Sequence, residues 1–153
     1  MLDLESIELI KQLKARYFRF LDTGDQAGLE TIFTEDVTAR FIGGHYDIDV
    51  AGRAKLLKFY GYSFTDQKFG MHTGHHPEIT VQGETATGLW YLQDIFINLE
   101  DNTTVMGSAL YTDKYARING DWRITHTAYE RLWEEIHPRS ADIQLLVRPV
   151  KPK

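Results

Sequence analysis

The residues best suited to chemistry are concentrated in residues 68–99, KFGMHTGHHPEITVQGETATGLWYLQDIFINL. His72, His75 and His76 stand directly before Pro77, and Asp94 lies among aromatic and aliphatic residues further along. Histidine can take and return a proton near neutral pH, because its unperturbed pKa is about 6.5. Burial of an unpaired carboxylate is costly, so Asp94 lies at a strand end or is buried for a purpose. The stretch predicts acid–base chemistry.

The same histidines could in principle hold a metal ion. An HxxHH pattern that ends at Pro77 is not expected to be helical, so we expect no metal site and place His75 and His76 at a strand entry or in a loop. The chain has no cysteine, which excludes thiolate nucleophiles and thiolate metal ligands. The expected chemistry therefore uses no metal and no cofactor.

The elements that must position these residues are strands joined by tight turns. Apolar residues alternate along 86–99 on both faces, as expected for a sheet that helices cover on one side and that lines a cavity. Gln82-Gly83-Glu84, residues 100–103 and above all Asn119-Gly120 are hairpin turns. The predicted strands run over about 78–81, 86–99, 104–118 and 121–133, and their length predicts bulges and strong curvature.

Helices are expected before the sheet. Asp3 can cap a first helix whose apolar stripe includes Tyr17 and which ends near Gly24. A second helix over 26–33, a strand over 37–42, an extended piece through Val50 and a third helix over 52–60 follow. One domain is expected over 1–153, with its core at about 4–133 and a strap or tail at 134–153.

Composition excludes several function classes. The net charge of −5 argues against a nucleic-acid partner. No stretch approaches the roughly 20 apolar residues that a membrane span needs, so no membrane partner is expected. Early charges such as Asp3, Glu5 and Lys11 do not suit a signal peptide, and with the absence of cysteine they favour a cytoplasmic location.

The order of the elements and several short motifs resemble the nuclear transport factor 2-like superfamily, within it the SnoaL-like branch. The matching motifs are Tyr17-(x4)-Asp22-Thr-Gly-Asp25, the turn 33–36, PEITVQGETATGLWY and YTDKYARINGDWRITHT. The resemblance covers about residues 9–131. It implies an α+β fold in which a cone-shaped, curved, mainly antiparallel sheet of five or six strands packs on three N-terminal helices.

Within that branch, the chain is similar to the bile-acid 7α-dehydratase, scytalone dehydratase and hexachlorocyclohexane dehydrochlorinase families. The resemblance implies that His72 is a general base paired with Asp22, and that Tyr17 or Asp94 supplies an acid or a polarising hydrogen bond. Arg117 resembles an arginine of the dehydrochlorinases. The expected activity is that of a lyase, most simply a dehydratase; an isomerase, a polyketide-cyclase-like enzyme and a non-catalytic ligand-binding or assembly subunit stay open.

Each candidate also has a purely structural interpretation. Asp22 could simply end a helix, Tyr17 could be a core residue, and His72 could be a satisfied strand histidine. Arg117 precedes the Asn119-Gly120 turn and could be a solvated charge. The candidate substrate-binding residues are Arg117, Trp90, His126 and Tyr60.

The expected partner is a small apolar or aromatic molecule, because eight Phe, eight Tyr and three Trp suit a pocket that excludes water. His126 is expected on the same face of the last strand as Trp122 and Ile124. A homo-oligomer, a dimer or trimer, is also expected, because apolar residues remain for the outer face of the sheet. These residues are Tyr91, Ile95, Ile97 and Tyr129. Tyr129, Arg131 and Trp133 continue the last strand and could serve an oligomer interface.

Overall fold

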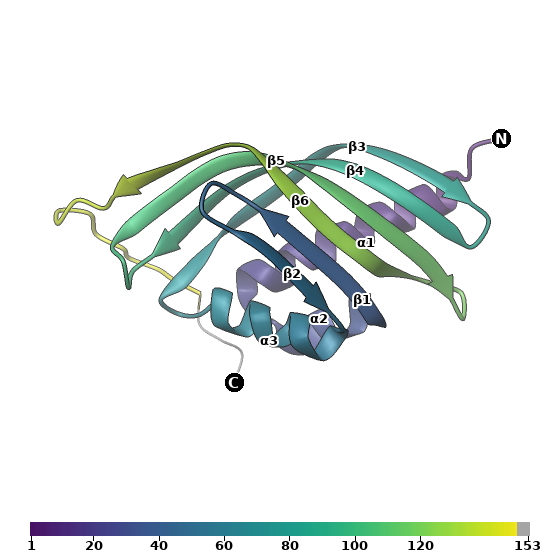
Figure 1. Ribbon diagram of the computed structural model, residues 1–153, viewed down its shortest axis with the longest axis horizontal. Helices are drawn as coiled ribbons and strands as arrows, with labels where there is room; N and C mark the ends of the chain where they lie inside the picture. Colours follow the sequence, from purple (N-terminus) through teal and green to yellow (C-terminus); the bar gives the residue numbers. More distant parts are fainter. Residues whose placement is uncertain (150–153) are drawn as a thin grey trace.

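The structure is a computed structural model and describes residues 1–149. Three helices pack on one curved, six-stranded sheet that does not close (Figure 1). The predicted fold class is confirmed. The elements are α1 (Leu4–Thr23), α2 (Gln26–Ile32), β1 (Phe33–Ile42), β2 (Asp47–Ala51), α3 (Arg53–Ser63), β3 (Lys68–Gln82), β4 (Thr85–Asn98), β5 (Thr103–Ile118) and β6 (Asp121–Pro138).

The strand order is β2-β1-β6-β5-β4-β3. Neighbouring strands are antiparallel except β1 and β6, which are parallel. The long connection that a parallel pair needs is formed here by β2, α3 and β3–β5. The sheet curves over α1, while α2 and α3 lie below β1 and β2 (Figure 1). The concave face of the sheet and the helices therefore enclose the interior.

The predicted helix ends follow from local chemistry. The Asp3 carboxylate accepts a hydrogen bond from the Ser6 backbone N at 3.0 Å and caps α1. α1 ends at Thr23, and its C-cap Gly24 adopts the left-handed conformation with φ of 67°. The Asp25 carboxylate then caps α2 through the Gly28 backbone N at 2.8 Å. These caps fix the position of Asp22, which lies in the last turn of α1.

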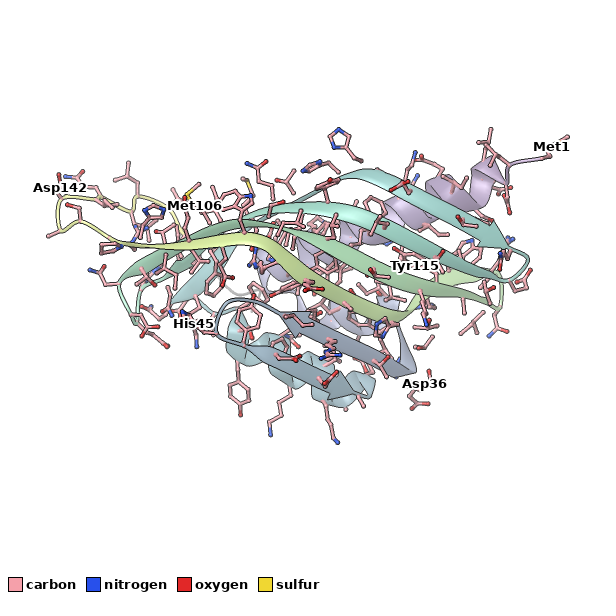
Figure 2. All side chains as sticks on the ribbon, turned by 45° about the horizontal axis from the view of Figure 1, so that its top comes forward. Met1, Asp36, His45, Met106, Tyr115 and Asp142 are labelled. Atoms are coloured by element: carbon pink, nitrogen blue, oxygen red, sulfur yellow. The ribbon has the colours of Figure 1, made fainter. Side chains whose placement is uncertain are left out.

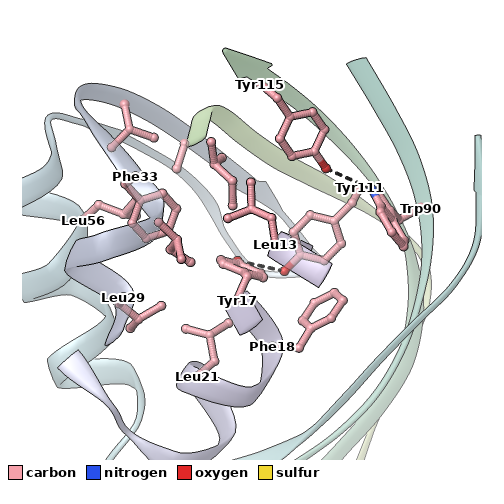
Figure 3. Packing of buried hydrophobic residues seen from close by; sticks show 14 of the residues in the cluster. Leu13, Tyr17, Phe18, Leu21, Leu29, Phe33, Leu56, Trp90, Tyr111 and Tyr115 are labelled. Carbon is pink, nitrogen blue, oxygen red and sulfur yellow. Dashed lines mark hydrogen bonds between the residues drawn. The ribbon is translucent and has the colours of Figure 1, made fainter. Parts of the chain in front are cut away.

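The core lies between α1 and the concave face of the sheet and is rich in aromatic residues. Figure 3 shows Tyr17 and Phe18 of α1 facing Tyr111 of β5, with Trp90 and Tyr115 beyond them. Trp90 is buried here, where its Nε1 donates to the Tyr115 hydroxyl at 3.0 Å. Aromatic side chains of α1 therefore form one wall of the interior.

Several strands and one helix are longer than predicted. β3 begins at Lys68 rather than near residue 78, so all three histidines of the 68–99 stretch belong to this strand. β1 begins at Phe33, directly after α2, and α3 extends to Ser63. β6 continues to Pro138, so the first residues of the predicted tail are part of the sheet. Residues 150–153 of that tail lie outside the described residues.

Two bulges divide β6. Tyr115 and Lys114 of β5 pair with Ile124 and His126, which leaves Thr125 as an extra residue. In the same way Ala109 and Ser108 pair with Arg131 and Trp133, which leaves Leu132 unpaired. Each extra residue reverses the alternation of side chains between the two faces of the strand.

The reversals correct three predictions. His126 does not share the inner face with Trp122 and Ile124, and its Nδ1 lies 2.7 Å from the Thr38 hydroxyl, on the exposed side. Tyr129 and Arg131, predicted on the outer face, point into the interior instead. Of the other residues expected outside, Tyr91 and Trp133 are exposed. The oligomeric state stays a prediction.

Candidate active site

A cavity of about 370 Å³ lies between the helices and the concave face of the sheet. Its walls are mostly aromatic and aliphatic, which makes it suited to a ring-shaped apolar ligand. Most of the polar side chains that border it fall into two groups, one around His72 and one around Arg131, and His45 and Ser63 also border it. The aromatic lining residues are Tyr17, Phe41, Tyr46, Phe59, Tyr60, Phe64, Phe96, Tyr111 and Tyr129.

The structure brings Asp22 and His72 into direct contact. His72 Nδ1 lies 2.5 Å from Asp22 Oδ1, and the His72 backbone N donates to Asp22 Oδ2 at 3.0 Å. An ionised carboxylate only accepts hydrogen bonds, so we assign the proton of the neutral ring to Nδ1. The other nitrogen, Nε2, is then free to accept a proton. His72 borders the cavity, whereas Asp22 lies behind it.

Aromatic neighbours hold the His72 ring. Phe18 of α1 stacks on it with ring centroids 5.7 Å apart and planes 9° apart, and the edge of Phe64 approaches at 5.5 Å. Gly74 leaves the space that Phe18 occupies, because a Cβ there would lie 2.2 Å from the Phe18 ring. The orientation of His72 is therefore fixed by Asp22 on one edge and by packing on its face.

Three tyrosine hydroxyls meet at the wall of the same cavity. The Tyr17 hydroxyl lies 2.9 Å from that of Tyr60 and 3.2 Å from that of Tyr111, and all three residues border the cavity. Three hydroxyls carry three protons, but two hydrogen bonds use only two of them. One hydroxyl therefore keeps a proton to donate to a ligand. Burial raises the pKa of Tyr17 far above its usual value, so the phenol stays protonated at neutral pH.

A buried ion pair lies behind the tyrosines. Lys14 Nζ is 2.7 Å from Asp113 Oδ2 and 3.6 Å from the centroid of the Tyr111 ring. The Tyr115 hydroxyl donates to the same Asp113 oxygen at 2.8 Å. Both charged residues are fully buried and neither borders the cavity. This pair can set the position of the tyrosines but cannot touch a ligand.

The second polar group lies on β4 and β6. Arg131 donates to both oxygens of Asp94, Nη1 to Oδ1 at 2.5 Å and Nη2 to Oδ2 at 2.9 Å. Its Nε lies 3.0 Å from Glu134 Oε2 and 3.3 Å from the Tyr46 hydroxyl. Burial would lower the pKa of Arg131, but the hydrogen bonds and charge of Asp94 outweigh burial and raise it. Arg131 is therefore a permanent cation.

Comparisons with known proteins identify the family and the fold. The family profile described as SnoaL-like domain matches residues 2–128. The chain belongs to the SnoaL-like domain family. Several solved structures share its fold. A type 2 hexachlorocyclohexane dehydrochlorinase, LinA, superposes with a TM-score of 0.76 at 19% identity, covering 96% of this chain and 97% of that chain.

Two further solved structures resemble this SnoaL-like protein. Rv3472, a protein of unknown function from Mycobacterium tuberculosis, has a TM-score of 0.72 at 26% identity, covering 84% of this chain and 72% of that chain. An NTF2-like protein with a cystatin-like fold from Novosphingobium aromaticivorans has a TM-score of 0.67 at 24% identity, covering 84% and 83% of the two chains. These similarities show the shared fold.

The candidate substrate-binding residues are divided in the structure of this SnoaL-like protein. Tyr60 borders the cavity, but Trp90, Arg117 and His126 do not. Arg117 Nε donates to the Gly120 carbonyl at 3.2 Å, at the β5–β6 hairpin, because it stands two residues before the turn. His126 borders a separate groove beside β2 and α3.

The three histidines weighed as a metal site are not gathered around one point. His75 Nδ1 lies 2.7 Å from His76 Nδ1 on the exposed side of β3, while His72 faces the cavity. Among residues 1–149, no three His, Asp or Glu side chains are arranged to hold a metal ion. In the same part of the chain, no helix is long and apolar enough to cross a membrane.

Sequence reasoning did not assign Tyr46, Tyr111, Arg131 or Glu134 to the site. Tyr111 could have been found, since it lies on the inner face of a predicted strand. Arg131 could not be found by alternation, because the extra residue at Thr125 moves it to the other face. Glu134 lies beyond the predicted end of the strand at residue 133, and the extra residue at Leu132 puts it on the same face as Arg131.

Proposed function

We propose that this SnoaL-like protein is a cofactor-free lyase of the dehydratase type that acts on a small, largely apolar ring compound. The observation that carries the proposal is the position of His72. Its Nδ1 contacts Asp22, while its ring borders an aromatic cavity beside three tyrosine hydroxyls. The dehydrochlorinase among the similar structures, whose name denotes an elimination, supports this reaction class.

The geometry supports a proton transfer from carbon. His72 Nε2 takes a proton from a carbon next to a carbonyl, and the electrons of that C–H bond form the new double bond. The leaving hydroxyl accepts this proton from the imidazolium and departs as water, so the histidine ends neutral. Asp22 holds the Nδ1–H tautomer and stabilises the imidazolium between these steps. A positioned acid–base group of this kind contributes about 10²–10⁴-fold to a rate.

The tyrosine cluster supplies the hydrogen bond to the carbonyl. Negative charge develops on that oxygen as the proton leaves, and a donor fixed in an apolar cavity stabilises it more strongly than water would. Tyr17 is well placed to hold the cluster together, because its hydroxyl contacts both others. The high pKa of Tyr17 keeps its proton available for donation.

Asp94 is better suited to accept than to act as an acid. Its two oxygens each accept a hydrogen bond from Arg131, which is the bidentate geometry of an ionised carboxylate. It lies directly opposite His72 on the neighbouring strand, so both side chains reach the same part of the cavity. Asp94 would accept a hydrogen bond from the ligand's hydroxyl group.

A substrate screen with matched variants tests the proposal. Cyclic hydroxy-ketones, β-hydroxy-thioesters and halogenated rings would be offered to the protein, with product detected by mass spectrometry. We expect His72→Ala to lower kcat/KM by at least about 10²-fold, Asp22→Asn to lose nearly as much, and Tyr17→Phe to lose less. His75→Ala is the control, because it removes a histidine of the same strand that does not border the cavity.

Retention of full activity by His72→Ala, at the level of His75→Ala, would contradict the proposal. Binding of ring compounds in the cavity with no turnover across the screen would also contradict it, and would identify a ligand-binding member of the family instead.

A further inference from the structure

The charge of Arg131 is already paired with acidic side chains of this chain. The Arg131 guanidinium donates to both oxygens of Asp94, and its Nε faces Glu134. Glu134 is held in turn by the Gly44 backbone N at 3.1 Å and the Tyr46 hydroxyl at 3.3 Å. Every nitrogen of the guanidinium therefore already faces an acceptor of this chain.

These charges lie inside the cavity. The exposed fractions of the side chains of Arg131, Asp94 and Glu134 are 10%, 6% and 13%. Of the described residues that line the cavity, Arg131 is the only Lys or Arg, whereas Asp94 and Glu134 are both acidic. The wall formed by β4 and β6 thus carries one positive and two negative charges, a net charge of −1.

We propose that Glu134 is a specificity-determining residue that makes this cavity select uncharged, hydroxyl-bearing ring compounds and reject carboxylates. The inference rests on the proposed function in so far as that function places the ligand in this cavity. Without Glu134, the pair of Arg131 and Asp94 would be neutral and its outer N–H groups could receive an anion. With Glu134 present, an entering carboxylate meets an excess negative charge.

An uncharged ligand fits the same wall. Each carboxylate oxygen can accept about two hydrogen bonds, so Asp94 and Glu134 keep acceptor capacity for a ligand hydroxyl. A hydroxyl donor is satisfied there, while a carboxylate offers only acceptors and repels the wall. Like charges brought together in a desolvated site cost enough to lower affinity by at least about tenfold.

Two fluorescent probes of nearly equal shape test the inference: 2-naphthalenemethanol, which is neutral and carries a hydroxyl, and 2-naphthoate, which is an anion. We expect the neutral probe to bind the natural protein at least about tenfold more tightly. In Glu134→Gln, 2-naphthoate should gain about tenfold, whereas binding of 2-naphthalenemethanol should change less than about twofold. Glutamine keeps an acceptor for Gly44, so the fold should persist, which circular dichroism would check.

Glu135→Gln is the matched control. It removes the same charge from the next residue, whose side chain is 54% exposed and pairs with His137 away from the cavity. Equal binding of the two probes by the natural protein, failure of both to bind, or an equal gain in Glu134→Gln and Glu135→Gln would overturn the inference. Probe binding is measured without turnover, so the two proposals can fail separately. A lack of turnover contradicts the proposed function alone. His72-dependent turnover of a carboxylate substrate contradicts only this inference.

Discussion

The buried pair of Lys14 and Asp113 gives a sharp stability prediction. The two side chains are 1% and 0% exposed and lie 2.7 Å apart, so removal of either leaves a charge in the core without its partner. Breaking such a pair typically costs about 3–5 kcal/mol. For a chain of this size, each kcal/mol shifts Tm by roughly 2–4 °C. We therefore expect Lys14→Met to lower Tm by roughly 6–20 °C.

The double variant Lys14→Met/Asp113→Asn should recover most of that loss. It removes both charges together, and the asparagine oxygen can still accept the hydrogen bond that the Tyr115 hydroxyl gives Asp113. Buried pairs replaced as a unit are often close to neutral in stability. The assay is thermal and urea unfolding of the natural protein, both single variants and the double variant, followed by circular dichroism. If the loss of stability in the double variant equals the sum of the losses in the two single variants, the reasoning is refuted. Such a sum would mean that neither single variant left a buried charge without its partner.

The same pair predicts a dependence on pH. Burial lowers the pKa of Lys14 from its ordinary value of 10.5, although Asp113 opposes the shift. Below pH 10.5 the unfolded chain therefore binds more protons at this residue than the folded protein does. The contribution of Lys14 to the free energy of unfolding must then rise with pH toward 10.5, and this slope should be absent in Lys14→Met/Asp113→Asn.

That measurement should stop near pH 9.5, because the buried tyrosines act in the opposite direction above about pH 10. Burial raises the pKa of Tyr17 and Tyr111, so the unfolded chain loses those protons first and stability falls as pH rises further. An equal slope between pH 7 and 9.5 in the natural protein and in the double variant would contradict the prediction.

Two glycine substitutions test the support of the site. Gly74→Ala places a Cβ 2.2 Å from the Phe18 ring. We expect the free energy of unfolding to fall by about 1–3 kcal/mol and the His72-dependent activity to fall with it. Unchanged thermal unfolding would contradict this. Gly24→Ala puts a side chain at φ of 67° at the end of α1; we expect a loss of about 1 kcal/mol in urea unfolding, whereas Gly24→Asn, which tolerates this conformation better, should lose less.

The parts of the fold that the sequence predicts are those specified by neighbouring residues. The Asp3 cap, the glycine terminus at Gly24 and the Asn119-Gly120 hairpin depend on contacts within a few residues, and all three occur as expected. The alternation along β4 also places Asp94 on the inner face correctly. Local propensity and turn chemistry act on the chain wherever it lies, so they can be recognised without the rest of the fold.

The parts that could not be predicted depend on pairing between distant strands. The extra residues Thr125 and Leu132 are defined by how β6 pairs with β5, and nothing in the local sequence marks them. A strict alternation therefore assigned His126 to the inner face and Tyr129 and Arg131 to the outer face, all three wrongly. One unseen bulge reverses every assignment that follows it until the next.

Lys14 shows the same limit for a helix. It stands three residues before Tyr17, on the buried side of α1, where a lysine would normally be exposed. Its partner Asp113 comes from the middle of β5, so no pattern within α1 indicates that the charge is compensated. A buried charge can be recognised as stable only when its partner is known.

The two bulges also explain how one cavity can hold two different kinds of chemistry. The part of the wall formed by α1, α3, β3 and β5 presents His72 and the three tyrosines, which can exchange a proton with a ligand. The wall formed by β4 and β6 presents Arg131 and Glu134 together, because the extra residue at Leu132 returns Glu134 to the inner face. Asp94 lies directly opposite His72, so the two groups meet in the same part of the cavity. The aromatic and aliphatic lining keeps the local dielectric low, which strengthens the interactions of each group with a bound ligand. A change in the register of β6 would exchange Glu134 for Glu135 at the cavity and alter the charge selection without touching the Asp22–His72 contact.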